Sequence, residues 1–91
     1  MIELVSFVTR GKIRKEVLKQ LTSPKTPTQI SLILSTQRPT ISRAILSLKN
    51  KDLVECLTPN EKMGRYYKIT NLGQEVLKEI NKLIIKGENK K

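Results

Sequence analysis

Hydrogen-bond donors suited to nucleic acid gather in one short segment of the chain. Arg43 lies in the middle of this segment, and a guanidinium can donate two parallel hydrogen bonds to O6 and N7 of a guanine. A second arginine, an amide and several hydroxyls surround it, and such groups bind phosphates or nearby bases. We therefore expect a nucleic-acid-binding surface made by Gln37, Arg38, Thr40, Ser42, Arg43 and Ser47.

The net charge of +10 is concentrated in the same half of the chain. Residues 10–51 carry ten Lys or Arg and one acid, a net charge of +9, whereas residues 52–91 carry eight and six, a net charge of +2. Residues 1–9 contribute the remaining −1. A one-sided positive field suits a polyanion such as double-stranded DNA. Charge alone fits a lysine-rich solubilising surface equally well, so the decision rests on the pattern of the helices.

The donors occupy the polar side of a predicted amphipathic helix. Pro39 opens this helix, because its fixed φ suits a first turn. At about 100° per residue, four apolar side chains of residues 40–51 fall in one arc of about 100°. They are Ile41, Ala44, Ile45 and Leu48. The donors lie around the remaining arc, together with the apolar Leu46.

A shorter helix precedes the polar one, at about residues 27–34. The run Thr26-Pro27-Thr28-Gln29 predicts its start, with Thr26 and Gln29 as a reciprocal capping box. Its buried face is expected to be Ile30, Ile33 and Leu34. The two helices and the turn between them form a predicted helix–turn–helix at about 27–51.

Two short strands, 53–58 and 65–69, are predicted to form a β-hairpin around a turn-rich stretch at 59–64. Tyr67 and Ile69 share the face that points inward. Lys62 and Arg65 flank the tip, where cations can bind the DNA backbone or a narrow minor groove. The alternative is an ordinary solvated turn.

Apolar segments at both ends of the chain suggest a dimer. An opening segment of one or two helical turns reaches to Gly11, a helix follows at about 10–21, and Thr70 caps a last helix at about 71–86 that Gly87 ends. The apolar arc of the last helix is wider than a small domain needs. We expect a two-fold interface formed by Leu4, Phe7, Leu72, Val76, Leu77, Ile80, Leu83 and Ile84. In the alternative, the opening segment folds onto the last helix within one chain.

The residue types argue against catalysis, a metal site or a cofactor. The chain has no histidine, the commonest general base, and its four glycines form no phosphate-binding loop. Cys56 is the only cysteine, so it can pair with no other in the chain, which fits a reducing cytoplasm. No signal peptide is evident, and the longest apolar run, 83–85, cannot span a membrane. We expect a cytoplasmic, nucleoid-associated protein.

The order of these elements resembles that of the winged-helix regulators. The run TQISLILSTQRPTISRAILSLKNKDLV, residues 28–54, looks like the helix–turn–helix of the MarR-like and ArsR-like families, and GRYYKITNLGQEVL, residues 64–77, resembles their second wing strand and following helix. The short form looks most like small archaeal members. Three positions depart from the pattern, because Ser35 and Asp52 replace the usual glycines and Thr36 replaces an apolar turn residue.

The resemblance implies a single winged helix–turn–helix domain over residues 1–91, mainly α with a small β-hairpin wing (α+β), the wing at about 53–69 and a dimerisation helix at about 71–86. It also implies a transcription regulator. We expect sequence-specific binding of double-stranded DNA by a dimeric repressor. The alternatives are a non-specific architectural DNA-binding protein and a winged-helix protein-interaction module. The sequence names no effector, and metal sensing through paired cysteines or histidines is not open to this chain.

Overall fold

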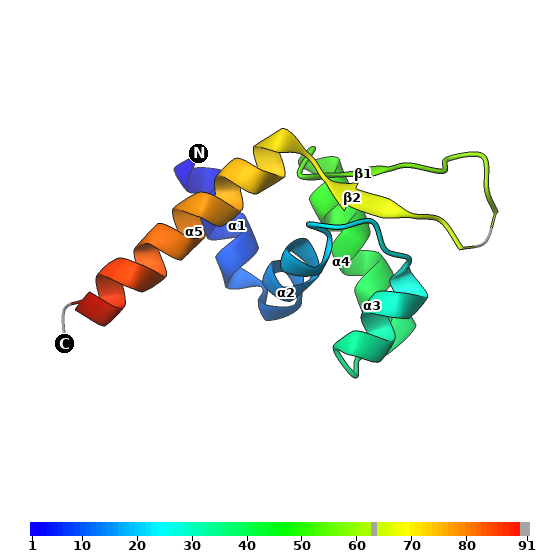
Figure 1. Cartoon of the computed structure of the whole chain (residues 1–91), viewed down its shortest axis with the longest axis horizontal. Coiled ribbons are helices and arrows are strands. Elements are labelled where there is room, and N and C mark those ends of the chain that lie inside the picture. The colour runs from blue at the N-terminus through cyan, green and yellow to red at the C-terminus, as the bar shows by residue number, and fades with distance from the viewer. Residues whose placement is uncertain (63, 90–91) are drawn as a thin grey trace.

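The computed structural model describes residues 1–62 and 64–89, and for residues 84–89 it gives only the course of the helix. Its elements, in chain order, are α1 (Ile2–Arg10), α2 (Lys12–Gln20), α3 (Pro27–Ile33), α4 (Arg38–Asn50), β1 (Val54–Cys56), β2 (Tyr67–Ile69) and α5 (Asn71–Asn89). The hairpin projects from the helical body beside α3 and α4 (Figure 1). The predicted class, mainly α with a small β-hairpin wing, is confirmed.

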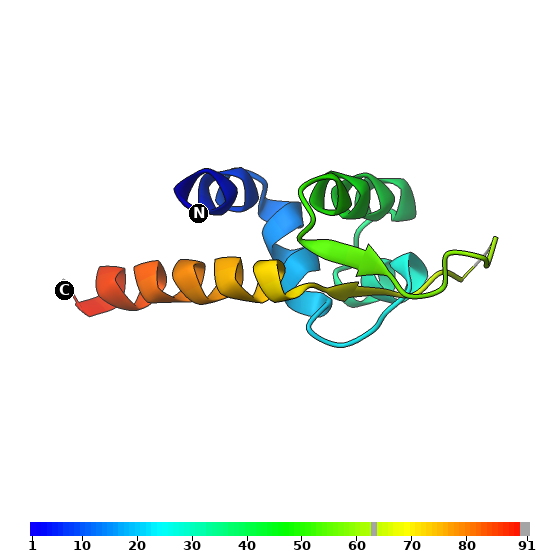
Figure 2. The same ribbon diagram turned by 90° about the horizontal axis from the view of Figure 1, so that it is seen from above.

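Gly11 divides the N-terminal region into two helices. Its φ of −110° and ψ of 106° are extended, so α1 ends before it and α2 begins after it. The predicted helix at 10–21 is therefore two residues shorter at its start. Seen from above, α1 and α4 lie along one side of the molecule and α5 along the other, with α2 between the two sides (Figure 2).

The start of α3 is as the sequence predicts. Gln29 N–H donates to Thr26 Oγ1 at 3.2 Å, and Thr26 N–H donates to Gln29 Oε1 at 2.9 Å, which completes the capping box. The prediction that Ile33 belongs to the buried face is wrong, because its side chain is 52% exposed. The helix ends at Ile33, and the half-buried Leu34, one position further round, packs against the core instead.

The core forms where α2, α3, α4 and α5 meet the hairpin. The four predicted residues of α4, namely Ile41, Ala44, Ile45 and Leu48, are all buried. They pack with other fully buried side chains, which include Val17, Leu18, Leu21, Ile30 and Val76. Each aliphatic side chain removed from water in this way contributes about 1.5–3 kcal/mol.

The turns on either side of α4 take left-handed backbone without glycine. Ser35 has a φ of 51° and Asp52 a φ of 59°. Short polar residues adopt this region more readily than bulky ones. Two of the three departures from the winged-helix pattern thus take a backbone conformation that glycine adopts at no steric cost.

The wing strands are shorter than predicted, but their inward face is correct. Val54 pairs with Ile69 and Cys56 with Tyr67, and both Tyr67 and Ile69 are buried. Sequence reasoning missed a third partner, since Lys25 exchanges two backbone hydrogen bonds with Tyr67, at 2.9 and 3.1 Å. This bridge fixes the hairpin to the loop that leads into α3.

Thr70 caps α5 and joins it to the end of the turn after α4. Its hydroxyl accepts from Gly73 N–H at 3.0 Å and donates to the Asp52 carbonyl at 2.7 Å. The prediction that Gly87 ends this helix is wrong, because α5 continues to Asn89. A glycine within a helix weakens it without breaking its hydrogen bonds, so it ends a helix only where a turn follows.

Candidate nucleic-acid interface

The predicted donors of α4 lie outside its buried arc, as the helical period predicts. At about 100° per residue, Arg43 lies roughly opposite the buried arc, and Ser42 and Ser47 lie on its two flanks. Arg43 is exposed, as is Leu46, at 53%. Ser42 and Ser47 are half-buried. The side of the helix that faces away from the core is thus polar, with one apolar side chain on it.

Gln37 and Arg38 lie at the entrance of α4, and both are exposed. Gln37 is the N-cap residue, although its side chain makes no capping hydrogen bond. Arg38 Nη1 donates to Thr28 Oγ1 at 3.4 Å, which links the first turn of α4 to the first turn of α3. This contact holds the guanidinium over the gap between the two helices.

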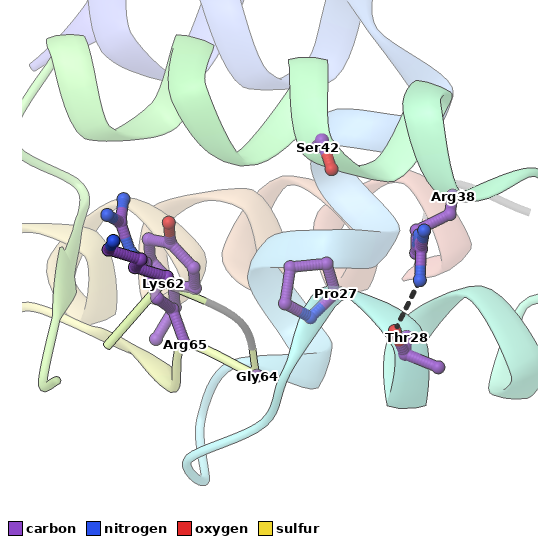
Figure 3. Close-up of a pocket in the computed structure, with 8 residues that line it drawn as sticks. Pro27, Thr28, Arg38, Ser42, Lys62, Gly64 and Arg65 are labelled. Atoms are coloured by element: carbon purple, nitrogen blue, oxygen red, sulfur yellow. Dashed lines mark hydrogen bonds between the residues drawn. The ribbon is translucent and has the colours of Figure 1, made fainter. Parts of the chain in front are cut away.

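A hollow of about 240 Å³ opens between α3, α4 and the hairpin, and we call it the wing hollow. Figure 3 shows Arg38 on one side of it and Lys62 and Arg65 on the other, with Pro27 between them and Ser42 above. Thr28, Gly64 and Tyr67 complete the lining. Three cations from segments more than 20 residues apart therefore face one concave surface.

The predicted set is divided between two places. Arg38, Ser42, Lys62 and Arg65 meet in the wing hollow. Thr40, Arg43 and Ser47 instead line a second hollow on the other flank of α4, against the corner between α1 and α2. Gln37 lines neither hollow. Sequence spacing placed the donors of α4 on one polar side of the helix, and the packing of α2 and the hairpin divides that side into two flanks.

The cations of the interface are not neutralised by neighbours. Among residues 1–62 and 64–83, the ion pairs are Lys19 with Glu16 at 3.7 Å and Lys82 with Glu79 at 3.5 Å. Neither pair includes a residue of the wing hollow. The positive charge there remains available to an anionic ligand.

Several residues of α5 that were predicted to form a dimer surface are buried within the single chain. Helices α1 and α5 pack against each other within the chain. Val76, Leu77 and Ile80 are buried in this single-chain core, and Leu4, Phe7 and Leu72 are half-buried against it. Leu83 is 57% exposed, whereas the side chain of Ile84 lies outside the described part. The alternative in which the opening segment covers the last helix accounts for most of the apolar arc.

The described residues form neither a metal-ligand cluster nor a helix suited to crossing a membrane. They contain no group of three His, Cys, Asp or Glu side chains placed to hold a metal ion. Over the same residues, none of the helices combines the length and the apolar character that a membrane crossing requires.

The fold is shared with several solved regulator structures, although no family model and no curated protein sequence matches the chain. A MarR variant from E. coli in complex with operator DNA is 26% identical, with a TM-score of 0.74 over 90% of this chain and 61% of that one. A MepR variant from S. aureus is 18% identical, with a TM-score of 0.77 over 88% and 62%.

A third structure, a ZitR variant from Lactococcus lactis, is 18% identical, with a TM-score of 0.70 over 79% of this chain and 51% of that one. The chain therefore spans about half to three-fifths of the length of these proteins. The likeness confirms the winged helix fold.

Proposed function

We propose that this protein is a DNA-binding transcription regulator and not an enzyme. The observation that carries the proposal is the meeting of Arg38, Lys62 and Arg65 in the wing hollow, beside the exposed side of α4. A concave surface lined by cations from a helix and a hairpin suits a phosphate backbone. Solved proteins with the same fold include MarR bound to operator DNA and MepR bound to DNA, which supports the same partner here.

In this proposal α4 enters the major groove of the duplex. A groove about 12 Å wide admits a helix, and Arg43 then points at base edges because it lies opposite the buried arc. Leu46 is placed to contact a thymine methyl group. The hairpin lies along the backbone, where Lys62 and Arg65 bind phosphates or the minor groove. Arg43 supplies the specificity, and the wing hollow supplies affinity.

We further propose that two copies bind a palindromic site as a repressor that blocks access to a promoter in the cytoplasm. The two-fold contact would use the exposed edge of the α1 and α5 pair, where Ile2 is 85% exposed and Leu83 57% exposed. Leu4, Phe7 and Leu72 are half-buried in the single chain. Two recognition helices would then read half-sites about one duplex turn, roughly 34–36 Å, apart.

Selection of bound duplexes from a random library tests this function directly. We expect one enriched palindromic sequence. The Arg43→Ala variant should lose about 1–3 kcal/mol of discrimination at one base pair of each half-site. The matched control is Lys78→Ala, which removes an equal charge from an exposed position on α5.

Three outcomes would each overturn a part of the proposal. Equal binding of every duplex by the parent protein at physiological salt would indicate a non-specific architectural protein. No binding of any duplex at low salt would reject DNA as the partner and favour an interaction module. If Arg43→Ala keeps the full preference of the parent, the readout by Arg43 is wrong.

A further inference from the structure

The second hollow, on the flank of α4 away from the wing, has the features of an anion site. Its volume is about 360 Å³, and we call it the corner hollow because the corner between α1 and α2 forms one wall. Lys12 and Arg14 come from that corner, and Arg43 comes from α4. No acid is among its lining residues, which are Gly11, Lys12, Ile13, Arg14, Thr40, Arg43, Ala44 and Ser47.

Arg14 is fixed in this wall by contacts of its own. Its Nη1 donates to the carbonyl oxygen of Phe7, and its Cζ lies 4.2 Å from the centroid of the Phe7 ring. A cation over an aromatic face is attracted by the electrons of the ring. The guanidinium of Arg14 is thus oriented before any ligand arrives, which lowers the entropy lost on binding.

Gly11 gives Arg14 the space that it occupies. A Cβ atom built at Gly11 would lie 2.7 Å from Arg14 Nε and 3.0 Å from its Cζ. Any other residue at this position would push the guanidinium out of its place. Gly11 therefore has two roles, since it separates α1 from α2 and leaves room for the guanidinium of Arg14.

Of the lysines on α2, Lys12 lies in this wall and Lys19 does not. Lys19 pairs with Glu16 at 3.7 Å and lies outside the hollow. Lys12 is exposed, lines the hollow and takes part in no ion pair with the described residues. From the sequence, Lys12, Arg14 and Lys19 could each touch a flanking phosphate or belong to a solvated face.

We propose that the corner hollow binds a backbone phosphate of the DNA duplex, held by Lys12 and Arg14 with the hydroxyls of Thr40 and Ser47, while Arg43 at its rim reads the base edges. The proposal rests on the proposed function. It places one phosphate site on each flank of α4, the wing hollow on one side and the corner hollow on the other. The two strands border the major groove on both sides, so such a pair of sites holds α4 in register between them.

The salt dependence of binding to the selected duplex tests this site. Each phosphate contact contributes about 0.9 to the slope of log K against log salt. We expect Lys12→Ala to lower the magnitude of that slope by about 0.9, so that its deficit against the parent shrinks about 3.5-fold between 50 and 200 mM salt. Lys19→Ala, which removes the same charge from the same helix, should keep the slope of the parent.

Single methylphosphonate substitutions in the duplex supply the second measurement. Neutralising the phosphate of the corner hollow should weaken the parent more than it weakens Lys12→Ala, because Lys12→Ala has already lost one of the charges that hold this phosphate. Arg14→Gln, checked for its fold by circular dichroism, should show the same reduced sensitivity. The measurement on Lys12→Ala does not depend on that variant, because the Lys12 side chain is exposed.

The result separates this proposal from the proposed function. If the parent binds its duplex with a steep salt slope while Lys12→Ala and Lys19→Ala change it equally, the corner hollow is not a phosphate site and the function stands. The same holds if Lys12→Ala keeps the sensitivity of the parent at every substituted phosphate. If the parent binds no duplex, both proposals fail together.

Discussion

Replacing Gly73 by alanine sets two effects of opposite sign against each other. Gly73 lies in the first turn of α5, where alanine would stabilise an isolated helix by about 0.8–1 kcal/mol. The structure predicts the reverse. A Cβ atom at this position would lie 2.2 Å from the carbonyl oxygen of Leu53 and 2.5 Å from Cγ1 of Ile69.

The overlap cannot be relieved by a side-chain rotation, because the nearest atom belongs to the backbone. Ordinary van der Waals contact begins at 3.4 Å and this separation is 2.2 Å, so the start of α5 must move away from Leu53 by about 1 Å. That shift would lengthen two hydrogen bonds of Thr70. Its N–H donates to the Leu53 carbonyl at 3.0 Å, and its hydroxyl donates to the Asp52 carbonyl at 2.7 Å. Overpacking costs about 1–3 kcal/mol, which exceeds the gain in helix propensity.

We therefore expect Gly73→Ala to lower the free energy of unfolding by up to about 2 kcal/mol, as the difference between these effects. Urea denaturation followed by circular dichroism measures this change. The control is Gln74→Ala, one residue further along the same helix, where the side chain is exposed and the change should stay within about 0.5 kcal/mol. A midpoint for Gly73→Ala equal to or above that of the parent would refute the close packing of α5 on Leu53.

Three other changes test separate parts of the structure. Thr26→Ala removes the capping box of α3 and should cost about 1 kcal/mol of stability in the same urea assay; an unchanged midpoint would contradict the cap. Arg65→Gln removes a cation of the wing hollow, so the salt slope of duplex binding should fall by about 0.9, whereas Lys78→Ala should leave it unchanged. Leu83→Lys places a charge on the exposed edge of α5 and should shift the protein towards monomer in sedimentation, and an unaltered dimer would exclude this edge as the contact.

Much of the local structure follows from short-range physics that the sequence displays. The capping box at Thr26 depends on residues three positions apart, and the buried arc of α4 depends on a helical period that Ile41 and Ile45 reveal directly. The inward face of the second wing strand follows from alternation in the same way. For these elements, neighbours in the chain decide the conformation.

The errors lie where distant segments compete for the same space. Ile33 has the right helical position for burial, but Leu34 fills the core because α3 ends there. The dimer predicted from the apolar residues of α5 stays a prediction, but Val76 and Ile80 are already buried within one chain, where α1 packs on α5. Periodicity shows that a face is apolar and does not show which partner covers it.

Residue types and spacing therefore determined the helices, the hairpin and the list of donors on α4. Only the tertiary structure decided which donors share a hollow, because Arg38 of α4 lines one hollow with Lys62 and Arg65 of the hairpin, and Arg43 lines another with Arg14 of α2. Contacts between residues more than 20 positions apart depend on how whole elements pack, and no local pattern encodes that packing.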